Sequence, residues 1–221
     1  MSEKAALLQC ASGNFFRQMV SRTSRRHAAY CERYEFEHVV RYRDPGTCFS
    51  DVMWWRVDCL KNLLESGVEF VAFLDSDSFI KRFVDLRQAL PEGFWLGLCA
   101  SPYAHYRDPF HLNFGVSYWR SCQESIAFLE EVQKFRKHMT PQEAEYHEQG
   151  CINHLLLDDT TRGRWQKGFM LLGGEWSSHP VFEKHVEKAY VVGAHGTHDD
   201  IDKIVMFQEL LERFPLVEMA V

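Results

Sequence analysis

The chain has 221 residues, of which 46% are hydrophobic and 25% are charged, and this composition is typical of one globular domain. The formal net charge of −6 argues against a protein that binds nucleic acid non-specifically. Seven scattered cysteines without a CxxC pair argue against a disulfide framework. Because the sequence also shows no signal peptide and no membrane-spanning run, we expect a soluble cytoplasmic protein in a reducing compartment.

Apolar runs alternate with amphipathic segments through the first third of the chain. They predict strands over residues 4–10, 36–42 and 68–74, and helices between them over residues 16–34 and 53–64. Gly67 is expected to end the second helix as a left-handed cap. We expect Arg22, Arg25, Arg26 and Arg33 to form a solvated basic face on the first helix. This order of elements predicts right-handed crossovers and a largely parallel sheet.

The second half of the chain adds three strands and three helices. The strands are predicted over residues 94–100, 112–119 and 190–193. Ser121 to Glu124 resembles a capping box that opens one helix, and Thr140 to Glu143 is a second capping box that opens a helix through about Leu157. The last helix is predicted over residues 201–214.

Two carboxylates end the central strand. Asp75 and Asp77 are two residues apart, so in an extended chain they point to the same side. Ligands collect at the carboxyl ends of strands in open α/β sheets. Two carboxylates on one side repel each other, and a hard divalent cation with oxygen ligands relieves that repulsion. The alternative is that both side chains are solvated in a loop after the strand.

Several short motifs occur in the order found in one enzyme family. The segment from Phe73 to Ser78, Phe-Leu-Asp-Ser-Asp-Ser, resembles the DxD motif of nucleotide-sugar glycosyltransferases with the GT-A fold, especially the glycogenin-like enzymes and the fungal and plant galactosyl- and xylosyltransferases. Further segments resemble that family's YAxxHGY, WxK, NxGV, DQ(G) and HFxG motifs, and they lie at residues 27–34, 55–56, 112–116, 148–150 and 192–196. In two places the sequence departs from the pattern, since Glu148 replaces Asp and Gly196 directly follows His195.

The resemblance implies an α/β protein with a single GT-A (Rossmann-like) domain over residues 1–221, whose mostly parallel central sheet is flanked by helices. The nucleotide-binding half would span about residues 1–100 and the acceptor half about residues 101–221. It also implies a metal-dependent glycosyltransferase that moves a sugar from a nucleotide-diphosphate donor, a UDP-sugar, to a hydroxyl group of a carbohydrate or glycoconjugate. Motifs around Asn113 and Glu148 resemble those of retaining enzymes.

The same resemblance assigns roles to individual residues. Asp75 and Asp77 would hold Mn²⁺ or Mg²⁺, and His195 would be a third ligand that favours Mn²⁺. Glu148 and Gln149 would face the donor sugar as the catalytic pair. The donor-binding residues would be Ala11, Ser12, Arg56, Ser76, Asn113 and Gly196. Each role has a plainer alternative: Arg56 on a helix surface, Glu148 and Gln149 as an exposed helix pair, and His195 hydrogen-bonded near a turn.

Two other functions fit part of the sequence. A strand ending in DxD also occurs in phosphatases of the haloacid dehalogenase type, with Asp75 as nucleophile, but in those enzymes the motif lies near the N-terminus. Here a strand, a helix, a strand and a helix precede it. A non-catalytic nucleotide-sugar-binding module is the second alternative, and the intact set of Asp75, Asp77 and His195 argues against it.

Overall fold

The computed structural model describes residues 3–44, 46–100, 112–158, 162–178, 186–194 and 200–216. In this part of the chain the central sheet has the spatial order β2 (Phe36–Arg43), β1 (Ala5–Ser12), β3 (Phe70–Asp75), β6 (Leu112–Arg120), β5 (Leu96–Ala100) and β7 (Phe169–Leu172). β1 pairs in parallel with β2 and β3, and β5 pairs in parallel with β7, whereas β6 runs antiparallel to both of its neighbours. The predicted α/β fold with a mostly parallel sheet is confirmed.

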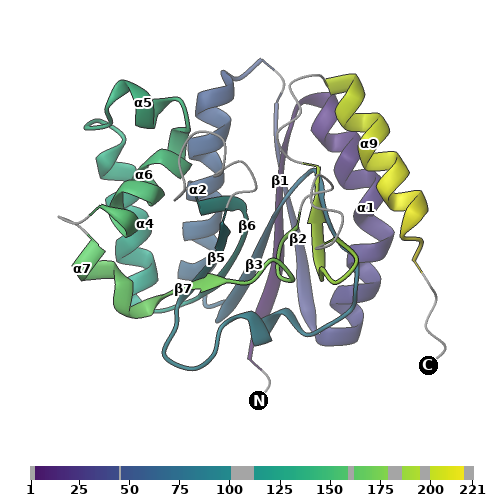
Figure 1. Ribbon diagram of the computed structural model, residues 1–221, viewed down its shortest axis with the longest axis horizontal. Helices are drawn as coiled ribbons and strands as arrows, with labels where there is room; N and C mark the ends of the chain where they lie inside the picture. Colours follow the sequence, from purple (N-terminus) through teal and green to yellow (C-terminus); the bar gives the residue numbers. More distant parts are fainter. Residues whose placement is uncertain are drawn as a thin grey trace.

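Helices cover both faces of this sheet (Figure 1). One face carries α1 (Gly13–Tyr34) and α9 (Asp200–Arg213), and the other carries α2 (Phe49–Glu65), α4 (Gln123–Phe135), α5 (Pro141–Ala144), α6 (His147–Leu157) and α7 (Arg162–Trp165). A small second sheet pairs β4 (Ser78–Ile80) with β8 (Val191–Gly193), and two 3₁₀ turns are η1 (Leu86–Ala89) and η2 (Gln166–Gly168). No helix in the described ranges is long and apolar enough to cross a membrane.

The central strands are apolar on both faces because both faces are covered. Leu8 and Phe73 are buried in the cluster on the side of α2, α4 and α6. Leu7, Phe70 and Leu74 are buried in the cluster on the side of α1 and η1. Successive strand residues point to opposite faces, so an unbroken apolar run fills both layers.

Two helix starts differ from the sequence prediction. The capping box of α4 is formed by Cys122 and Ser125, because the Ser121 hydroxyl instead donates to the Leu64 carbonyl at 3.0 Å. The predicted capping box at Thr140 is confirmed, but its helix ends at Ala144 and a second helix begins at His147. The expected continuous helix through Leu157 was therefore wrong.

Arg26 also departs from the expected solvated basic face. It is 6% exposed, and its guanidinium donates to the carbonyls of Ile80, at 3.2 Å, and Phe214. These bonds tie α1 to the segment after β3 and to the residue after α9. The spacing of residues along α1 could not show that Arg26 is buried, because its hydrogen-bond acceptors come from distant parts of the chain.

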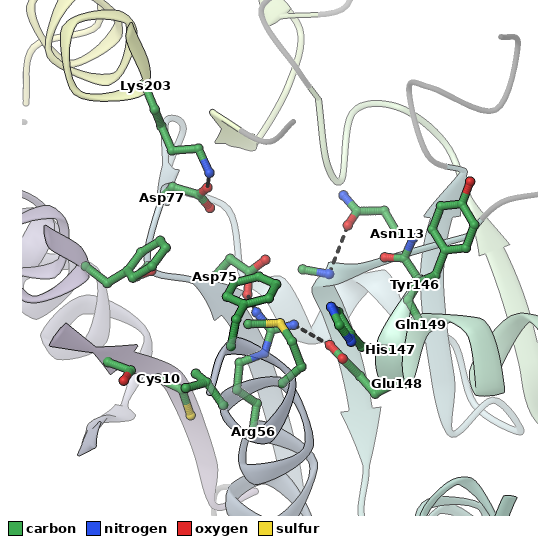
Figure 2. Close-up of a pocket in the computed structure, with 17 residues that line it drawn as sticks. Cys10, Arg56, Asp75, Asp77, Asn113, Tyr146, His147, Glu148, Gln149 and Lys203 are labelled. Atoms are coloured by element: carbon green, nitrogen blue, oxygen red, sulfur yellow. Dashed lines mark hydrogen bonds and ion pairs between the residues drawn. The ribbon is translucent and has the colours of Figure 1, made fainter. Parts of the chain in front are cut away.

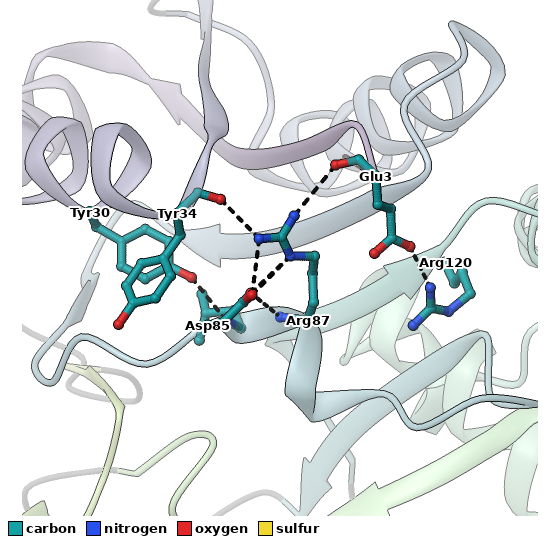
Figure 3. A network of polar contacts seen from close by, with 7 residues as sticks. Glu3, Tyr30, Tyr34, Asp85, Arg87 and Arg120 are labelled. Carbon is teal, nitrogen blue, oxygen red and sulfur yellow. Dashed lines mark hydrogen bonds and ion pairs between the residues drawn. The ribbon is translucent and has the colours of Figure 1, made fainter. Parts of the chain in front are cut away.

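The sheet end opposite the carboxyl ends of β1 and β3 is fastened by a polar network (Figure 3). Arg87 makes a two-pronged ion pair with Asp85 and donates to the Tyr34 carbonyl at 3.0 Å. Its guanidinium also reaches the Glu3 carbonyl, while the Glu3 carboxylate pairs with Arg120. The network joins the chain before β1, the end of α1 and the end of β6.

A buried histidine holds the segment that carries Asp75. His27 Nε2 accepts from the Ile80 N–H at 3.3 Å, so its Nδ1 carries the proton and donates to Gln9 Oε1 at 2.8 Å. Gln9 Nε2 in turn donates to the Asp75 carbonyl at 3.5 Å. Burial, with smaller contributions from the neighbouring His38 and Arg26, lowers the pKa of His27 to about 3.

This pKa predicts a pH-dependent stability. His27 stays neutral in the folded state but binds a proton below about pH 6.5 when unfolded. The free energy of unfolding should therefore fall as pH drops from about 6.5 toward 3, by up to about 1.4 kcal/mol per pH unit from this group. His27→Gln should flatten the dependence in urea titrations at pH 7 and pH 5, whereas His138→Gln on the surface should not. An unchanged slope in His27→Gln would refute this role.

Candidate active site

A pocket of about 300 Å³ lies at the carboxyl ends of β1 and β3. In the sheet β1 lies between β2 and β3, so the next strand after β1 is on one side of it and the following strand is on the other. Ligands bind at such a reversal of strand order in α/β sheets. The lining also includes residues from the starts of β6, α2 and α6, Phe16 of α1 and Lys203 of α9 (Figure 2). Because β6 is antiparallel to β3, its first residues lie beside the end of β3.

Most of the predicted site residues line this one pocket: Ser12, Arg56, Asp75, Ser76, Asp77, Asn113, Glu148 and Gln149. Ala11 is 1% exposed at the end of β1 and is not among the described residues that line it. His195 and Gly196 lie outside the described residues. The fold thus gathers side chains that are far apart in the sequence.

Arg56 bridges two carboxylates at the floor of the pocket (Figure 2). Its Nη1 donates to Asp75 Oδ1 and its Nη2 to Glu148 Oε1, the latter at 2.6 Å. The guanidinium also packs over the rings of Phe73 and Phe114, at 5.4 and 5.7 Å from their centroids. Burial alone would lower the pKa of Arg56, but Asp75 and Glu148 outweigh it and raise that pKa. Arg56 is therefore a permanent buried cation and not a surface side chain.

Glu148 is 2% exposed and lies in the first turn of α6. In the single helix predicted from Thr140 to about Leu157, Glu148 would lie near the middle, and this was wrong because the chain turns between Ala144 and His147. This turn directs the carboxylate inward to Arg56, and the second oxygen, Oε2, is buried without a hydrogen-bond partner. Gln149 is partly buried, and its Oε1 accepts from the Phe114 N–H at 3.2 Å.

Lys203 is a site residue that the sequence did not reveal. Its Nζ lies 3.0 Å from Asp77 Oδ2, and the two side chains are 13% and 7% exposed. It reaches the pocket from α9, on the opposite side from Arg56 (Figure 2). The last helix was predicted, but its apolar spacing does not show which polar side chain enters a distant pocket.

The described lining is negatively charged overall. Three of its charged residues are carboxylates, Asp75, Asp77 and Glu148, and two are cations, Arg56 and Lys203. Cys10 also lines the pocket, but a hydrogen bond with Cys59 and burial raise the pKa of its thiol well above the ordinary value. The thiol therefore stays neutral and is not an activated nucleophile.

The donor chemistry of Asp75 and Asp77 fits a hard divalent cation, because carboxylate oxygens are the ligands such ions prefer. Within the described ranges no three His, Cys, Asp or Glu side chains converge as a metal site. The Ala194 N–H donates to the Asp77 carbonyl at 2.8 Å, so the residue before His195 is hydrogen-bonded to the DxD segment. This contact ties the end of β8 to the segment that carries Asp75 and Asp77.

Comparison with known proteins identifies the family. Residues 17–173, well over half of the chain, match the family model described as nucleotide-diphospho-sugar transferase. The chain belongs to this family of glycosyltransferases.

The fold of the transferase is also found in a solved structure. It is similar to the crystal structure of a glycosyltransferase involved in the glycosylation of the major capsid of PBCV-1, with a TM-score of 0.71 over 93% of this chain and 99% of that one. Sequence identity is 15%, so this likeness concerns the fold alone. A sequence search of curated proteins found no match. The family match argues against the phosphatase hypothesis, because the family transfers sugars. In addition, Asp75, the nucleophile in that hypothesis, forms an ion pair with Arg56.

A substitution at Gly115 would test how tightly Asp75 is packed in the transferase. A Cβ at this position would overlap Asp75 Oδ2 and come within 3.1 Å of Asn113 Oδ1. Since Arg56 restrains Asp75, we expect Gly115→Ala to displace the carboxylate and to weaken UDP binding in Mn²⁺ by about 10-fold, or about 1.4 kcal/mol.

The measurement is a calorimetric titration of UDP, accompanied by thermal denaturation. Gly163→Ala is the matched control, because a Cβ there would meet no atom within 4 Å. Equal UDP affinity in Gly115→Ala and the wild type would show that Asp75 can shift without consequence.

Proposed function

We propose that this glycosyltransferase moves a sugar from a UDP-sugar to a hydroxyl group of a carbohydrate or glycoconjugate acceptor, and that it requires Mn²⁺ or Mg²⁺. The observation that carries the proposal is the charge of the pocket. Its described lining has one more carboxylate than it has cations. A diphosphate entering such a pocket is repelled unless a divalent cation enters with it.

Asp75 and Asp77 are the residues that would hold the cation, with His195 as a third ligand. When bound, the ion supplies electrostatic stabilisation of the departing diphosphate. The polar groups around it would orient the donor: Ser12 and Ser76 beside the nucleotide and Asn113 beside the sugar hydroxyls. Gly196 is proposed as a further donor-binding residue, whereas Ala11 is 1% exposed and is not among the described residues that line the pocket, so a direct contact of Ala11 with the donor is not proposed.

Glu148 is proposed to face the anomeric carbon. Its buried Oε2 has no hydrogen-bond partner, while Oε1 is held by Arg56. A carboxylate fixed in this way would stabilise positive charge that develops on the sugar ring. Gln149, anchored to the start of β6, would hydrogen-bond the same sugar. We further propose retention of configuration, and a β-linked product from an α-linked donor, seen in the anomeric proton coupling, would contradict it.

Release of UDP from a panel of UDP-sugars, without added acceptor, tests the activity. We expect slow release from at least one donor in Mn²⁺, none in excess chelator, and no hydrolysis of a generic phosphate ester. Cleavage of the phosphate ester without UDP release would instead support a phosphatase. Binding of UDP-sugars without any release, with or without a mixed panel of acceptor sugars, would indicate a non-catalytic binding module.

A further inference from the structure

One wall of the pocket is apolar and aromatic, in contrast to its charged floor. Phe49, Val52 and Met53 contribute it from the start of α2, and His147 contributes from the start of α6. Phe49 is 56% exposed, and its ring meets the His147 ring edge to face, with centroids 5.4 Å apart. By contrast, the tryptophans Trp54, Trp95, Trp119 and Trp165 are buried in the core and cannot stack on a ligand.

The backbone of His147 is strained. It adopts φ +50°, in the left-handed region, which costs a residue other than glycine about 1–3 kcal/mol. The other such residue in the described ranges, Glu35, is an ordinary helix C-cap, whereas His147 begins a helix. The turn brings the imidazole against Phe49 and directs the next side chain, Glu148, to Arg56. One strained residue therefore sets both the aromatic wall and the buried carboxylate.

We infer that Phe49 and His147 form the acceptor subsite and that the acceptor group is a neutral sugar ring. The inference rests on the proposed function. A sugar presents an apolar C–H face that can stack on the Phe49 ring, and a ring nitrogen of His147 can hydrogen-bond a hydroxyl. Because Glu148 lines the same pocket as Phe49 and His147, a sugar on this wall lies near the carboxylate proposed to face the anomeric carbon.

The negative charge of the described lining favours a neutral sugar over an acidic one. The described lining already has an excess carboxylate, so a uronic acid or a phosphorylated sugar would be repelled. The wall itself presents no carboxylate and no permanent cation: it consists of Phe49, Val52, Met53 and an imidazole. A nucleotide base could also stack on an aromatic ring, but the nucleotide is proposed to lie beside Ser12 and Ser76, at the carboxyl ends of β1 and β3.

The test is saturation-transfer NMR of the full chain in Mn²⁺ and UDP, with methyl glycosides of glucose, galactose, mannose and xylose as probes and methyl glucuronide as the acidic comparison. We expect at least one neutral glycoside to bind and the glucuronide not to bind. Phe49→Ala should weaken glycoside binding by about 10-fold and leave UDP affinity within about twofold. Leu171→Ala is the matched control, since Leu171 is 59% exposed on β7.

Each other outcome overturns the inference. If UDP binds normally but no neutral glycoside binds, or if the glucuronide binds equally well, the wall is not a subsite for neutral sugars and the proposed function stands. If Phe49→Ala weakens UDP as much as the glycoside, the wall belongs to the nucleotide. If UDP fails to bind the wild-type protein in Mn²⁺, the proposed function fails and this inference fails with it.

Discussion

Arg56→Met is expected to lower the free energy of unfolding by about 3–5 kcal/mol, the usual cost of removing one partner from a buried ion pair. Met keeps much of the volume that packs on Phe73 and Phe114, so loss of charge dominates the effect. Glu148, with a side chain 3% exposed, would be left as a buried carboxylate with no counter-ion. Asp75, with a side chain 19% exposed, would lose the same partner.

Urea denaturation at pH 7 measures this loss. The matched control is Arg136→Met, which breaks an exposed pair with Asp51 and should cost at most about 1 kcal/mol. Adding Glu148→Gln to Arg56→Met should restore part of the stability, because it removes the uncompensated charge. If Arg56→Met cost no more than Arg136→Met, Arg56 would not be the cation that makes this buried site possible.

Asp77→Asn is expected to reduce turnover by at least about 100-fold, the upper end of what loss of an outer-shell partner of a metal costs. The variant keeps the shape of the side chain but removes the negative charge that would hold a divalent cation. Lys203 loses its ion pair with Asp77, but the amide oxygen of Asn can still accept a hydrogen bond from that ammonium, so the fold should remain intact. Turnover as a function of Mn²⁺ concentration, with thermal denaturation alongside, measures both expectations.

Lys203→Met is the companion variant. It removes the ammonium that neutralises Asp77, so Mn²⁺ binding to the protein alone should become tighter, the opposite of the effect of Asp77→Asn. Calorimetric titration with Mn²⁺ compares the two. Normal turnover of Asp77→Asn at low Mn²⁺ would exclude Asp77 as a ligand, and failure of that variant to fold would make Asp77 a structural residue.

Local patterns predicted five of the six strands of the central sheet and the longer helices, but not β4, β7 or α7. Apolar runs ending in polar residues predicted the strands, and the end of β3 placed Asp75 and Asp77 at an edge where ligands bind. The order of short motifs also brought Arg56 and Glu148 into the prediction, and the structure joins them at 2.6 Å. These features are encoded by residues close together in the chain.

The remaining features depend on contacts between distant segments. Lys203 enters the pocket only because α9 packs against α1 and the small sheet, through Phe207 and Leu210. The break before His147 accompanies a contact between distant segments, the ion pair of Glu148 with Arg56, which the local helix pattern does not show. The antiparallel direction of β6 is likewise set by its pairing with β3 and β5, and an apolar run does not show the direction in which its strand pairs.

Calorimetric titration of UDP into the protein, once with Mn²⁺ and once with excess chelator, tests the central claim most directly. The described lining of the pocket carries more negative than positive side chains, and a diphosphate adds to that excess. We expect UDP to bind at least about 10-fold more tightly with Mn²⁺, a difference of at least about 1.4 kcal/mol. Equal UDP affinity in chelator and in Mn²⁺ would contradict a metal-dependent nucleotide-sugar site.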